Sequence, residues 1–166
     1  MVAVCIAFAY DGDVQCGVVY NPFMEEMFWA IKGKDAKLNG QDIHVSNLND
    51  LKRAVFATGF PYDKDSLDPI LKRIDIMVRH CQDMRRLGSA ALDICWVACG
   101  RLDLYFESLS PWDFAAARLI ALQAGATCGH FCDVPNEIPV SIFDKNLLIS
   151  TPELYEESRA LLAPTA

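Results

Sequence analysis

The chain has 166 residues and a mass of 18.5 kDa, with 15 Lys and Arg against 22 Asp and Glu, which gives a net charge of −7. A hydrophobic fraction of 52% with 22% charged residues is typical of a globular domain and excludes a disordered chain. The acidic balance argues against a general affinity for nucleic acid or for an anionic membrane. An anionic ligand would therefore need a local site or a bound cation.

The seven cysteines are an odd number, and several lie in apolar runs such as residues 93–99. This setting favours buried free thiols over a disulfide framework, so we expect a reducing, cytoplasmic compartment. Cys128, His130 and Cys132 could be half of a zinc site. Their spacing is cramped and no second ligand pair follows, so ordinary side chains are the favoured interpretation.

The first ten residues are apolar, and Ala7-Phe8-Ala9 faintly resembles a signal-peptide cleavage site. They lack a basic start, and Asp11-Gly12-Asp13 follows at once, so a strand that ends in a hairpin turn is favoured. No run approaches the ~18 apolar residues of a membrane span. We therefore expect a soluble protein with no membrane partner.

Two architectures follow each other along the chain, over residues 1–50 and 51–166. The first part predicts an antiparallel meander with strands over Val2–Tyr10, Val14–Tyr20, Glu26–Ile31 and Gln41–Val45. Its turns are expected at Asp11-Gly12-Asp13, Asn21-Pro22, Lys32-Gly33-Lys34 and Asn39-Gly40.

From about Leu51 strands and helices alternate, which predicts an α/β layered fold. Apolar residues from Leu67 to Cys81 recur at helical spacing, which predicts an amphipathic helix. A second helix over Ser89–Cys99 is apolar nearly all round and should be buried, with Gly100 at its end. The remaining expected elements are strands over Ala54–Thr58, Leu102–Phe106 and Asn146–Ser150 and helices over Trp112–Ala124 and Pro152–Leu162.

Two carboxylates lie near the predicted end of a strand and the start of the next helix, which is where open α/β sheets bind ligands. Pro111-Trp112-Asp113 opens a predicted helix, so Asp113 either stabilises that helix end or is a metal-binding carboxylate beside an anion site. Glu107 follows the strand Leu102–Phe106, six positions before Asp113. It either lines a cleft with Asp113 or is a solvated loop residue, and the residues alone leave both interpretations open.

A third candidate is Gly88-Ser89-Ala90, which begins a helix after Arg85-Arg86. Small residues there let a ligand approach free backbone N–H groups, although a Ser N-cap with close helix packing is the favoured interpretation of this segment taken alone. His44 and His80 are isolated, which favours surface roles. The sequence has no phosphate-binding P-loop, no G-x-S-x-G elbow and no H-E-x-x-H motif.

Together these segments resemble the inositol monophosphatase family of magnesium-dependent sugar phosphatases. The resemblance covers nearly the whole chain and rests on Gly17-Val18-Val19-Tyr20-Asn21-Pro22, Glu26-Met27-Phe28-Trp29-Ala30, Leu38-Asn39-Gly40, Gly88-Ser89-Ala90-Ala91-Leu92, Pro111-Trp112-Asp113-Phe114-Ala115-Ala116 and Gln123-Ala124-Gly125-Ala126. It implies an α/β fold in which a remnant of the N-terminal antiparallel sheet precedes a mixed sheet between helices. This would correspond to the C-terminal two-thirds of the family's sandwich.

By this resemblance Asp113 would bind a catalytic Mg²⁺ and the substrate, and Gly88, Ser89, Ala90 and Glu107 would hold the substrate. The implied reaction is hydrolysis of a phosphate monoester, such as inositol 1-phosphate or a related sugar phosphate, with Mg²⁺ activating water. Fructose-bisphosphatase-like and nucleotide-phosphate phosphatases are sibling alternatives. A non-catalytic ligand-binding or scaffolding module derived from the same fold is an alternative from another class.

The sequence also departs from the family pattern. The segment from Glu107 to Asp113 is one residue short, Arg118 stands where a Gly commonly follows the paired alanines, and Ala126 replaces a second Gly. The family's Gly-Glu-Glu segment and its Asp-Pro-Ile/Leu-Asp-Gly-Thr loop, which supply most metal ligands, do not occur in the sequence. A single carboxylate holds Mg²⁺ weakly, so we expect little or no Mg²⁺ binding and no phosphatase activity from this chain alone.

The resemblance has a further consequence for association. In the family, helices from the upstream segment cover one face of the antiparallel sheet, and here that face would carry Val2, Val4, Ile6, Phe8, Val18 and Tyr20. Leaving about five large apolar side chains uncovered forfeits roughly 10 kcal/mol, which is comparable to the stability of a whole domain. We therefore expect the chain to form a dimer, otherwise self-associate or aggregate unless a partner covers that face.

Overall fold

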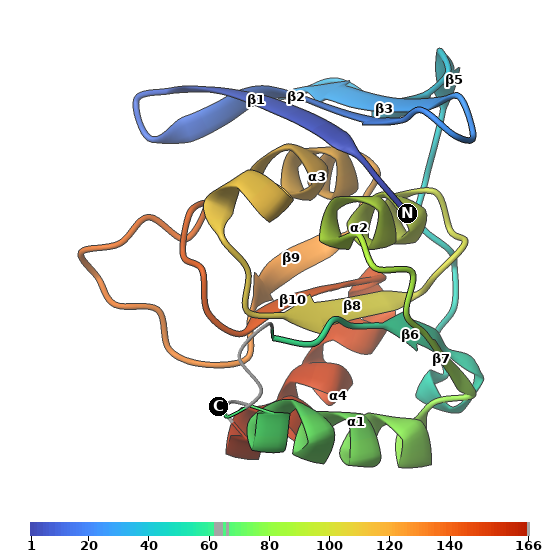
Figure 1. The fold of residues 1–166 in the computed structure, drawn as a ribbon, viewed down its shortest axis with the longest axis vertical. Coiled ribbons are helices and arrows are strands. Elements are labelled where there is room, and N and C mark those ends of the chain that lie inside the picture. Colours follow the sequence, from blue (N-terminus) through green and yellow to red (C-terminus); the bar gives the residue numbers. More distant parts are fainter. Residues whose placement is uncertain (62–64, 66, 166) are drawn as a thin grey trace.

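The computed structural model describes residues 1–61, 65 and 67–165. It consists of two five-stranded sheets and four α-helices arranged in layers (Figure 1). Helices α2 (Ala90–Ala98) and α3 (Pro111–Gln123) lie between the sheets, and helices α1 (Leu67–His80) and α4 (Pro152–Leu162) cover the far side of the second sheet. This is the layered α/β class that the sequence predicts.

The first sheet is an antiparallel meander in chain order, as expected. Its strands are β1 (Val4–Tyr10), β2 (Asp13–Asn21), β3 (Glu26–Ile31), β4 (Lys37–Leu38) and β5 (Gln41–Asp42). Asp11 and Gly12 both have positive φ angles, of 51° and 77°. This is the two-residue hairpin turn that an Asp-Gly pair predicts, because its backbone twist matches that of the flanking strands.

One predicted strand of this sheet is wrong in extent. The expected segment Gln41–Val45 is a strand only at Gln41–Asp42. The Ile43 N–H donates to the carbonyl of Ala36, and the Val45 N–H donates to the carbonyl of Ala124 at the end of α3. The chain therefore leaves the sheet early because its backbone groups find partners elsewhere.

The second sheet is mixed and has the order β7-β6-β8-β10-β9. Its strands are β6 (Val55–Ala57), β7 (Asp83–Arg85), β8 (Leu104–Glu107), β9 (Thr127–His130) and β10 (Leu147–Ser150). Strand β6 pairs in parallel with β7 and β8, whereas β10 is antiparallel to β8 and β9. A mixed sheet between helices is what the resemblance implied.

The sequence pattern does not predict strands β4, β7 and β9, and it predicts an end of strand β8 that is too early. The short segments of β4 and β7 contain polar residues without an apolar run, and β9 was interpreted as a Cys/His cluster. Strand β8 includes Glu107, which was expected to lie just past a strand ending at Phe106. The backbone of Glu107 is therefore held in place by pairing with strand β10, so Glu107 is not a solvated loop residue.

Two apolar clusters hold the layers together. One joins the inner face of the first sheet to α2 and α3 and includes Phe28, Leu92 and Ile120. The other fills the space between the second sheet and helices α1 and α4, where Phe56 and Phe106 stack with ring centroids 5.6 Å apart. Helix α2 is buried along seven of its residues, as its all-round apolar sequence predicts.

Two further expectations from the sequence concern the burial of the cysteines and the surface of the molecule. All seven cysteines are free thiols. Cys95 is buried, and the other six are half-buried.

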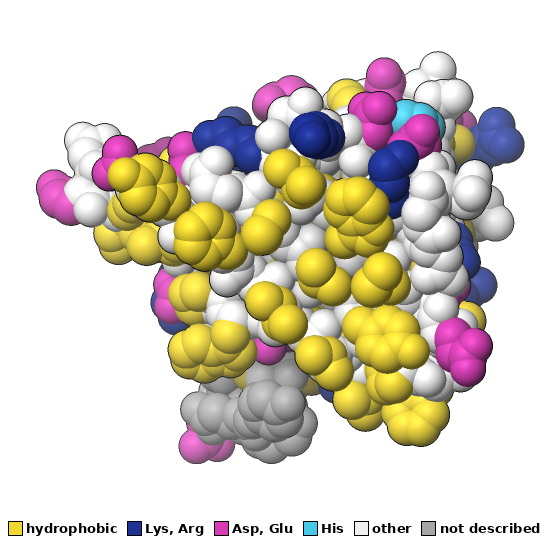
Figure 2. All heavy atoms as spheres, turned by 90° about the horizontal axis from the view of Figure 1, so that it is seen from above, with side chains coloured by type: hydrophobic (Ala, Val, Ile, Leu, Met, Phe, Trp, Pro, Cys, Tyr) yellow, Lys and Arg dark blue, Asp and Glu magenta, His cyan; other side chains and the backbone are white. Residues whose placement is uncertain are grey.

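No helix within residues 1–61, 65 and 67–165 is long and apolar enough to cross a membrane. The outer side of the first sheet is uncovered, as expected: Val4, Ile6 and Phe8 are exposed, although Val18 and Tyr20 are half-buried. Figure 2 shows the hydrophobic side chains gathered over this side of the molecule.

Candidate functional site

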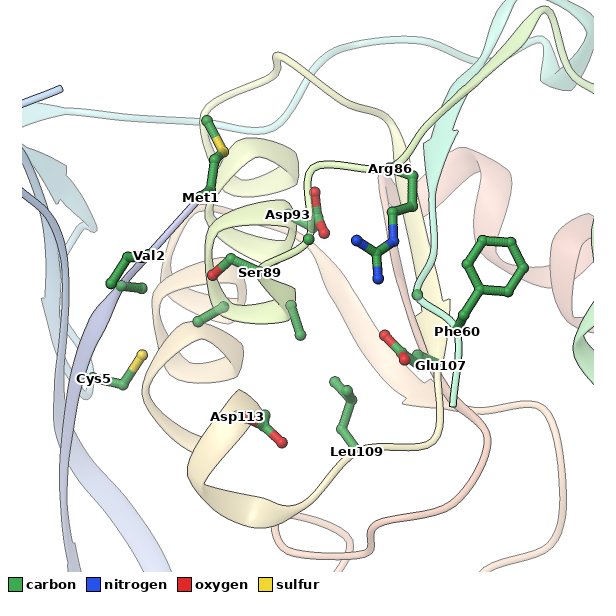
Figure 3. Close-up of a pocket in the computed structure, with 15 residues that line it drawn as sticks. Met1, Val2, Cys5, Phe60, Arg86, Ser89, Asp93, Glu107, Leu109 and Asp113 are labelled. Atoms are coloured by element: carbon green, nitrogen blue, oxygen red, sulfur yellow. The ribbon is translucent and has the colours of Figure 1, made fainter. Parts of the chain in front are cut away.

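A cavity of about 260 Å³, here called the site cavity, lies where α2 and α3 begin and β8 ends (Figure 3). All five residues singled out from the sequence line it, although they come from three separate elements. They are Gly88, Ser89, Ala90, Glu107 and Asp113. The wall also includes Met1, Val2, Cys5, Phe60, Arg86, Asp93 and Leu109.

Glu107 stands at the end of β8 with its carboxylate held from two sides. The buried Tyr105 hydroxyl donates a hydrogen bond to Glu107 Oε2, and the Gly59 backbone N–H also hydrogen-bonds the carboxylate. Burial raises the pKa of Glu107, and the negative charge of Asp113 adds to the rise, while the Tyr105 bond and Arg86 oppose it. The result is a carboxylate with a fixed orientation toward the cavity.

Gly59 is required for this arrangement. A Cβ atom at position 59 would lie 2.3 Å from both carboxylate oxygens of Glu107. Gly59 directly follows the expected strand Ala54–Thr58 and is not among the residues expected at the site from the sequence. Parallel pairing of β6 and β8 brings the two segments together, because the end of one strand lies beside the end of the other.

Asp93 is a further carboxylate in the cavity that the sequence analysis missed. It belongs to the first turn of α2, is only 2% exposed, and its Oδ1 atom has no hydrogen-bond partner within the part of the chain that the structure describes. Burial, followed by repulsion from Glu107, raises its pKa to about 7. A lone Asp in an otherwise apolar helix was the signal in the sequence that could have found it.

The positive side of the cavity is formed by Arg86 and the N-terminus of α2. Gly88 has a φ of +86°, and a Cβ there would lie 2.9 Å from an Arg86 guanidinium nitrogen, so glycine lets this arginine lie close to the backbone. Ser89 occupies the N-cap position of α2 without a side-chain capping bond. Its hydroxyl and the first N–H groups of the helix can therefore meet an anion or a ligand hydroxyl.

Asp113 completes the cavity from the first turn of α3. Figure 3 shows that Arg86, Glu107 and Asp113 point toward one common space. The Cys5 thiol of β1 faces the same region, and its pKa is raised by burial and then by the charge of Asp113. The first sheet and the second half of the chain thus both contribute to one wall.

The three carboxylates do not make a metal centre by themselves. Among the described residues no three His, Cys, Asp or Glu side chains lie close enough together to hold a metal ion. The Glu107 carboxylate is engaged by Tyr105 and Gly59, and Asp93, although it lines the cavity, is only 2% exposed. Mg²⁺ prefers six oxygen ligands, so the side chains present do not fit it.

The Cys/His cluster considered from the sequence has other partners. The two ring nitrogens of His130 lie 2.7 Å from the carbonyl oxygen of Lys145 and 3.3 Å from that of Val140. The Cys128 thiol lies 3.9 Å from the carbonyl oxygen of Arg118. These side chains serve to fasten the segment after β9 to its neighbours.

Comparison with known proteins identifies the family of the chain. A model of the inositol monophosphatase family matches residues 1–165. The chain belongs to the inositol monophosphatase family. The Nus factor SuhB of Pasteurella multocida is 43% identical over 133 residues, which are 79% of this chain and 49% of that protein. The Nus factor SuhB of Vibrio cholerae is 44% identical over 131 residues, 78% of this chain and 49% of that protein.

Solved structures of family members have the same fold. Inositol monophosphatase from Anabaena sp. PCC 7120 superposes with a TM-score of 0.89 at 30% identity, over 98% of this chain and 64% of that one. The SuhB protein from Bartonella henselae gives a TM-score of 0.87 at 32% identity, over 96% of this chain and 60% of that one. The chain therefore spans about half the length of the curated relatives that it matches.

Proposed function

We propose that the site cavity binds a small phosphorylated polyol or sugar, as in a Mg²⁺-dependent phosphatase that hydrolyses phosphate monoesters. The observation that carries the proposal is the placement of Arg86 and the α2 N-terminus opposite Glu107 and Asp113 in one cavity. A phosphate ester of a polyol has an anionic end and several hydroxyl donors. It therefore matches a cavity with a positive side and a carboxylate side.

The geometry supports a role for each of these residues in the proposed binding. Arg86 and the N–H groups at the start of α2 would bind anionic or hydroxyl oxygens of the ligand, with the Ser89 hydroxyl beside them. Glu107, held in place by Tyr105, would accept hydrogen bonds from ligand hydroxyls, as would Asp113. Ala90 and Gly88 leave the backbone open to the ligand because they have little or no side chain.

We further propose that the 166-residue chain binds such a ligand without hydrolysing it. The family is generally Mg²⁺-dependent, and the described side chains do not assemble a metal centre. Glu107 and Asp113, with Asp93 ionised only in part at neutral pH, outweigh the single arginine Arg86, so a phosphate ester should bind weakly without an added cation. A non-catalytic binding module that needs no Mg²⁺ is the second candidate function. The buried Asp93 Oδ1 atom, which has no hydrogen-bond partner among the described residues, favours it because a polar ligand could supply one.

Calorimetry of the purified chain with inositol 1-phosphate, with and without Mg²⁺, tests the binding. We expect weak binding that drops at least tenfold in Asp113→Asn. Asp68→Asn is the matched control, because Asp68 also lies in the first turn of a helix but is remote from the cavity. Absence of binding in the wild-type chain would overturn the proposed ligand class.

A phosphate-release assay tests the second half of the proposal. The expected result is no Mg²⁺-dependent release of phosphate from inositol 1-phosphate. Release that disappears in Asp113→Asn would show that the chain is a complete phosphatase. Binding enhanced by Mg²⁺ without release would identify a remnant enzyme site, whereas Mg²⁺-independent binding would identify a binding module.

A further inference from the structure

A cavity of about 370 Å³, here called the second cavity, adjoins the site cavity at Gly59 and Glu107, which line both. The rest of its wall comes from the segment after β6, from α1, and from the segments that follow β8 and precede β10. No residue of the first sheet takes part among the described lining residues. Its other lining residues are Pro61, Pro69, Ile70, Arg73, Ser108 and Lys145.

The second cavity has the opposite charge balance to the site cavity. Arg73 and Lys145 line it together with Glu107, which is the one carboxylate among its described lining residues. Asp144 lies 3.6 Å from the Nζ atom of Lys145, but both side chains are largely exposed, and such surface pairs contribute little. The second cavity therefore favours an anion, whereas carboxylates dominate the site cavity.

Arg73 is a buried arginine without a counterion. It is 8% exposed and forms no ion pair with any residue that the structure describes. Its hydrogen bonds go to two neutral oxygens of Thr165, from Nε to Oγ1 at 3.1 Å and from Nη2 to the carbonyl oxygen at 2.9 Å. A buried charge without a counterion is costly, so an anion in the cavity would stabilise Arg73.

The guanidinium group of Arg73 is ordered before any anion binds. Its central carbon lies 4.9 Å from the centre of the Phe131 ring, and Thr165 holds the Nε and Nη2 atoms. The Nη1 atom has no hydrogen-bond partner in the described part of the chain, so its N–H donors are available to a ligand. Because the side chain is already held, binding an anion costs little conformational entropy.

Lys145 is brought to the same cavity by the turn before β10. The Asn146 N–H donates to the Ser108 hydroxyl at 3.0 Å, and the Leu109 N–H donates to the Asp144 carbonyl at 2.9 Å. These two bonds hold the segment that carries Lys145 beside the end of β8. The Lys145 side chain is exposed and has a flexible stem, so its ammonium group can move onto an anion that Arg73 binds.

We propose that the second cavity is an oxyanion site in which Arg73 and Lys145 bind a phosphate group. A phosphate has several acceptor oxygens, so it accepts hydrogen bonds from a guanidinium and an ammonium group at once. The phosphate belongs either to a ligand that also fills the site cavity or to a free inorganic phosphate, and both present the same oxygens. The positive groups of the site cavity are Arg86 and the α2 N-terminus, so this proposal does not depend on the proposed function.

Titration with inorganic phosphate, followed by backbone amide NMR in metal-free buffer of low ionic strength, tests the site. The amide signals of Ser108 and Lys145 should shift and reach saturation in the wild-type chain. They should do the same in Arg86→Gln, which removes a cation of the site cavity alone. Shifts confined to residues 88–90 would place the phosphate in the site cavity and overturn the proposal.

Two variants of the second cavity test its cations. Phosphate affinity should fall roughly threefold in Lys145→Gln and roughly tenfold in Arg73→Gln. Lys72→Gln is the matched control, since Lys72 is also an exposed lysine but does not line the cavity, and its affinity should stay unchanged. If Arg73→Gln does not fold, the exposed Lys145 still decides: equal affinities in Lys145→Gln and Lys72→Gln would overturn the proposal.

Calorimetry with inositol 1-phosphate and inositol 1,4-bisphosphate distinguishes the two sources of the phosphate group. A bisphosphate that binds at least tenfold tighter than the monophosphate, with an advantage that shrinks in Lys145→Gln, would identify a second phosphate of the same ligand. Equal affinities, with inorganic phosphate still bound beside the monophosphate, would identify a free anion. If neither the bisphosphate nor inorganic phosphate depends on Arg73 and Lys145, the proposal is wrong.

Discussion

The Tyr105 hydroxyl donates a hydrogen bond to Oε2 of Glu107, two residues further along β8. Alternate residues of a strand point to the same side, so the strand itself sets the two groups at bonding distance. Tyr105 is completely buried and sits in the ladder opposite Ile149 of β10. A rigid donor of this kind holds the carboxylate in one orientation at the cavity wall.

Replacing Tyr105 by Phe should therefore weaken ligand binding without unfolding the chain. The carboxylate loses the donor that opposes the rise in its pKa, so the pKa of Glu107 should increase further. A hydrogen bond to a charged group contributes about 1.5 kcal/mol or more, so affinity for inositol 1-phosphate should fall about tenfold. Calorimetry measures the affinity, and carboxyl-carbon NMR measures the pKa of Glu107.

Tyr155→Phe is the control for this experiment. Tyr155 is also a buried tyrosine, but it lies on α4 beside Gly129 and far from the site cavity. It should leave both the affinity and the pKa of Glu107 unchanged. Equal affinities in Tyr105→Phe and the wild-type chain would show that the hydrogen bond does not position Glu107 for a ligand.

Gly59→Ala should weaken ligand binding strongly while changing the stability of the chain only slightly. The added Cβ would lie 2.3 Å from the Glu107 oxygens, which belong to the flexible end of a side chain. The carboxylate can swing away at small energetic cost, so Tm should change by only a few degrees while affinity drops at least tenfold. Thermal unfolding and calorimetry on the same sample check both parts, and retained affinity would contradict the assigned role of Glu107.

Asp93 should make the stability of the chain depend on pH. Its pKa is about 7 in the folded state against an ordinary value of 3.8, so the folded state binds the proton more tightly than the unfolded state. Its stabilising contribution is complete below about pH 4 and is lost as the pH rises through 7. A shift of about three units at ~1.4 kcal/mol each sets a ceiling of about 4 kcal/mol.

Asp93→Asn removes this titration and keeps a neutral group of similar shape. The variant should gain stability over the wild-type chain between pH 5 and pH 8, by on the order of 2–4 kcal/mol. Urea unfolding at each pH measures the difference, in which the other carboxyl groups cancel. Asp68→Asn on the surface of α1 should show no such trend, and a flat difference for Asp93→Asn would contradict the raised pKa.

The parts of the site that the sequence predicts are those held by local structure. Gly88-Ser89-Ala90 and Asp113 each sit at the start of a helix, which small residues and a Pro at the first turn indicate without tertiary information. Asp93 was missed because the lone acid in an apolar helix indicates a special environment but does not indicate which cavity the helix lines. Gly59 is 48 positions from Glu107, and their contact depends on the pairing of β6 with β8.

The same distinction applies to the fold. The hairpin at Asp11-Gly12 and the helix Pro152–Leu162 follow from turn chemistry and helical periodicity, and both agree with the structure. Strands β7 and β9 are only three and four residues long. They form because neighbouring strands supply hydrogen-bond partners. Such short polar segments contain no apolar pattern that would predict a strand.

Gly17 lies where strand β2 packs against the backbone of α3. A Cβ at position 17 would lie 2.7 Å from the carbonyl oxygen of Ala116 and 2.9 Å from its Cα atom. These are backbone atoms of a buried helix, so they cannot move aside as the Glu107 side chain can. Gly17→Ala should push β2 away from α3 and lower the free energy of unfolding by about 1–3 kcal/mol.

The reduced flexibility of the unfolded chain offsets about 0.4–1 kcal/mol of this loss, so the net effect remains destabilising. Urea unfolding should show a lower midpoint with an unchanged slope. Cys16→Ala, at the neighbouring position of β2, is the control and should change the stability much less, because alternate residues of a strand point to opposite faces and Gly17 faces α3. A Gly17→Ala variant as stable as Cys16→Ala would mean that the sheet and helix separate without cost.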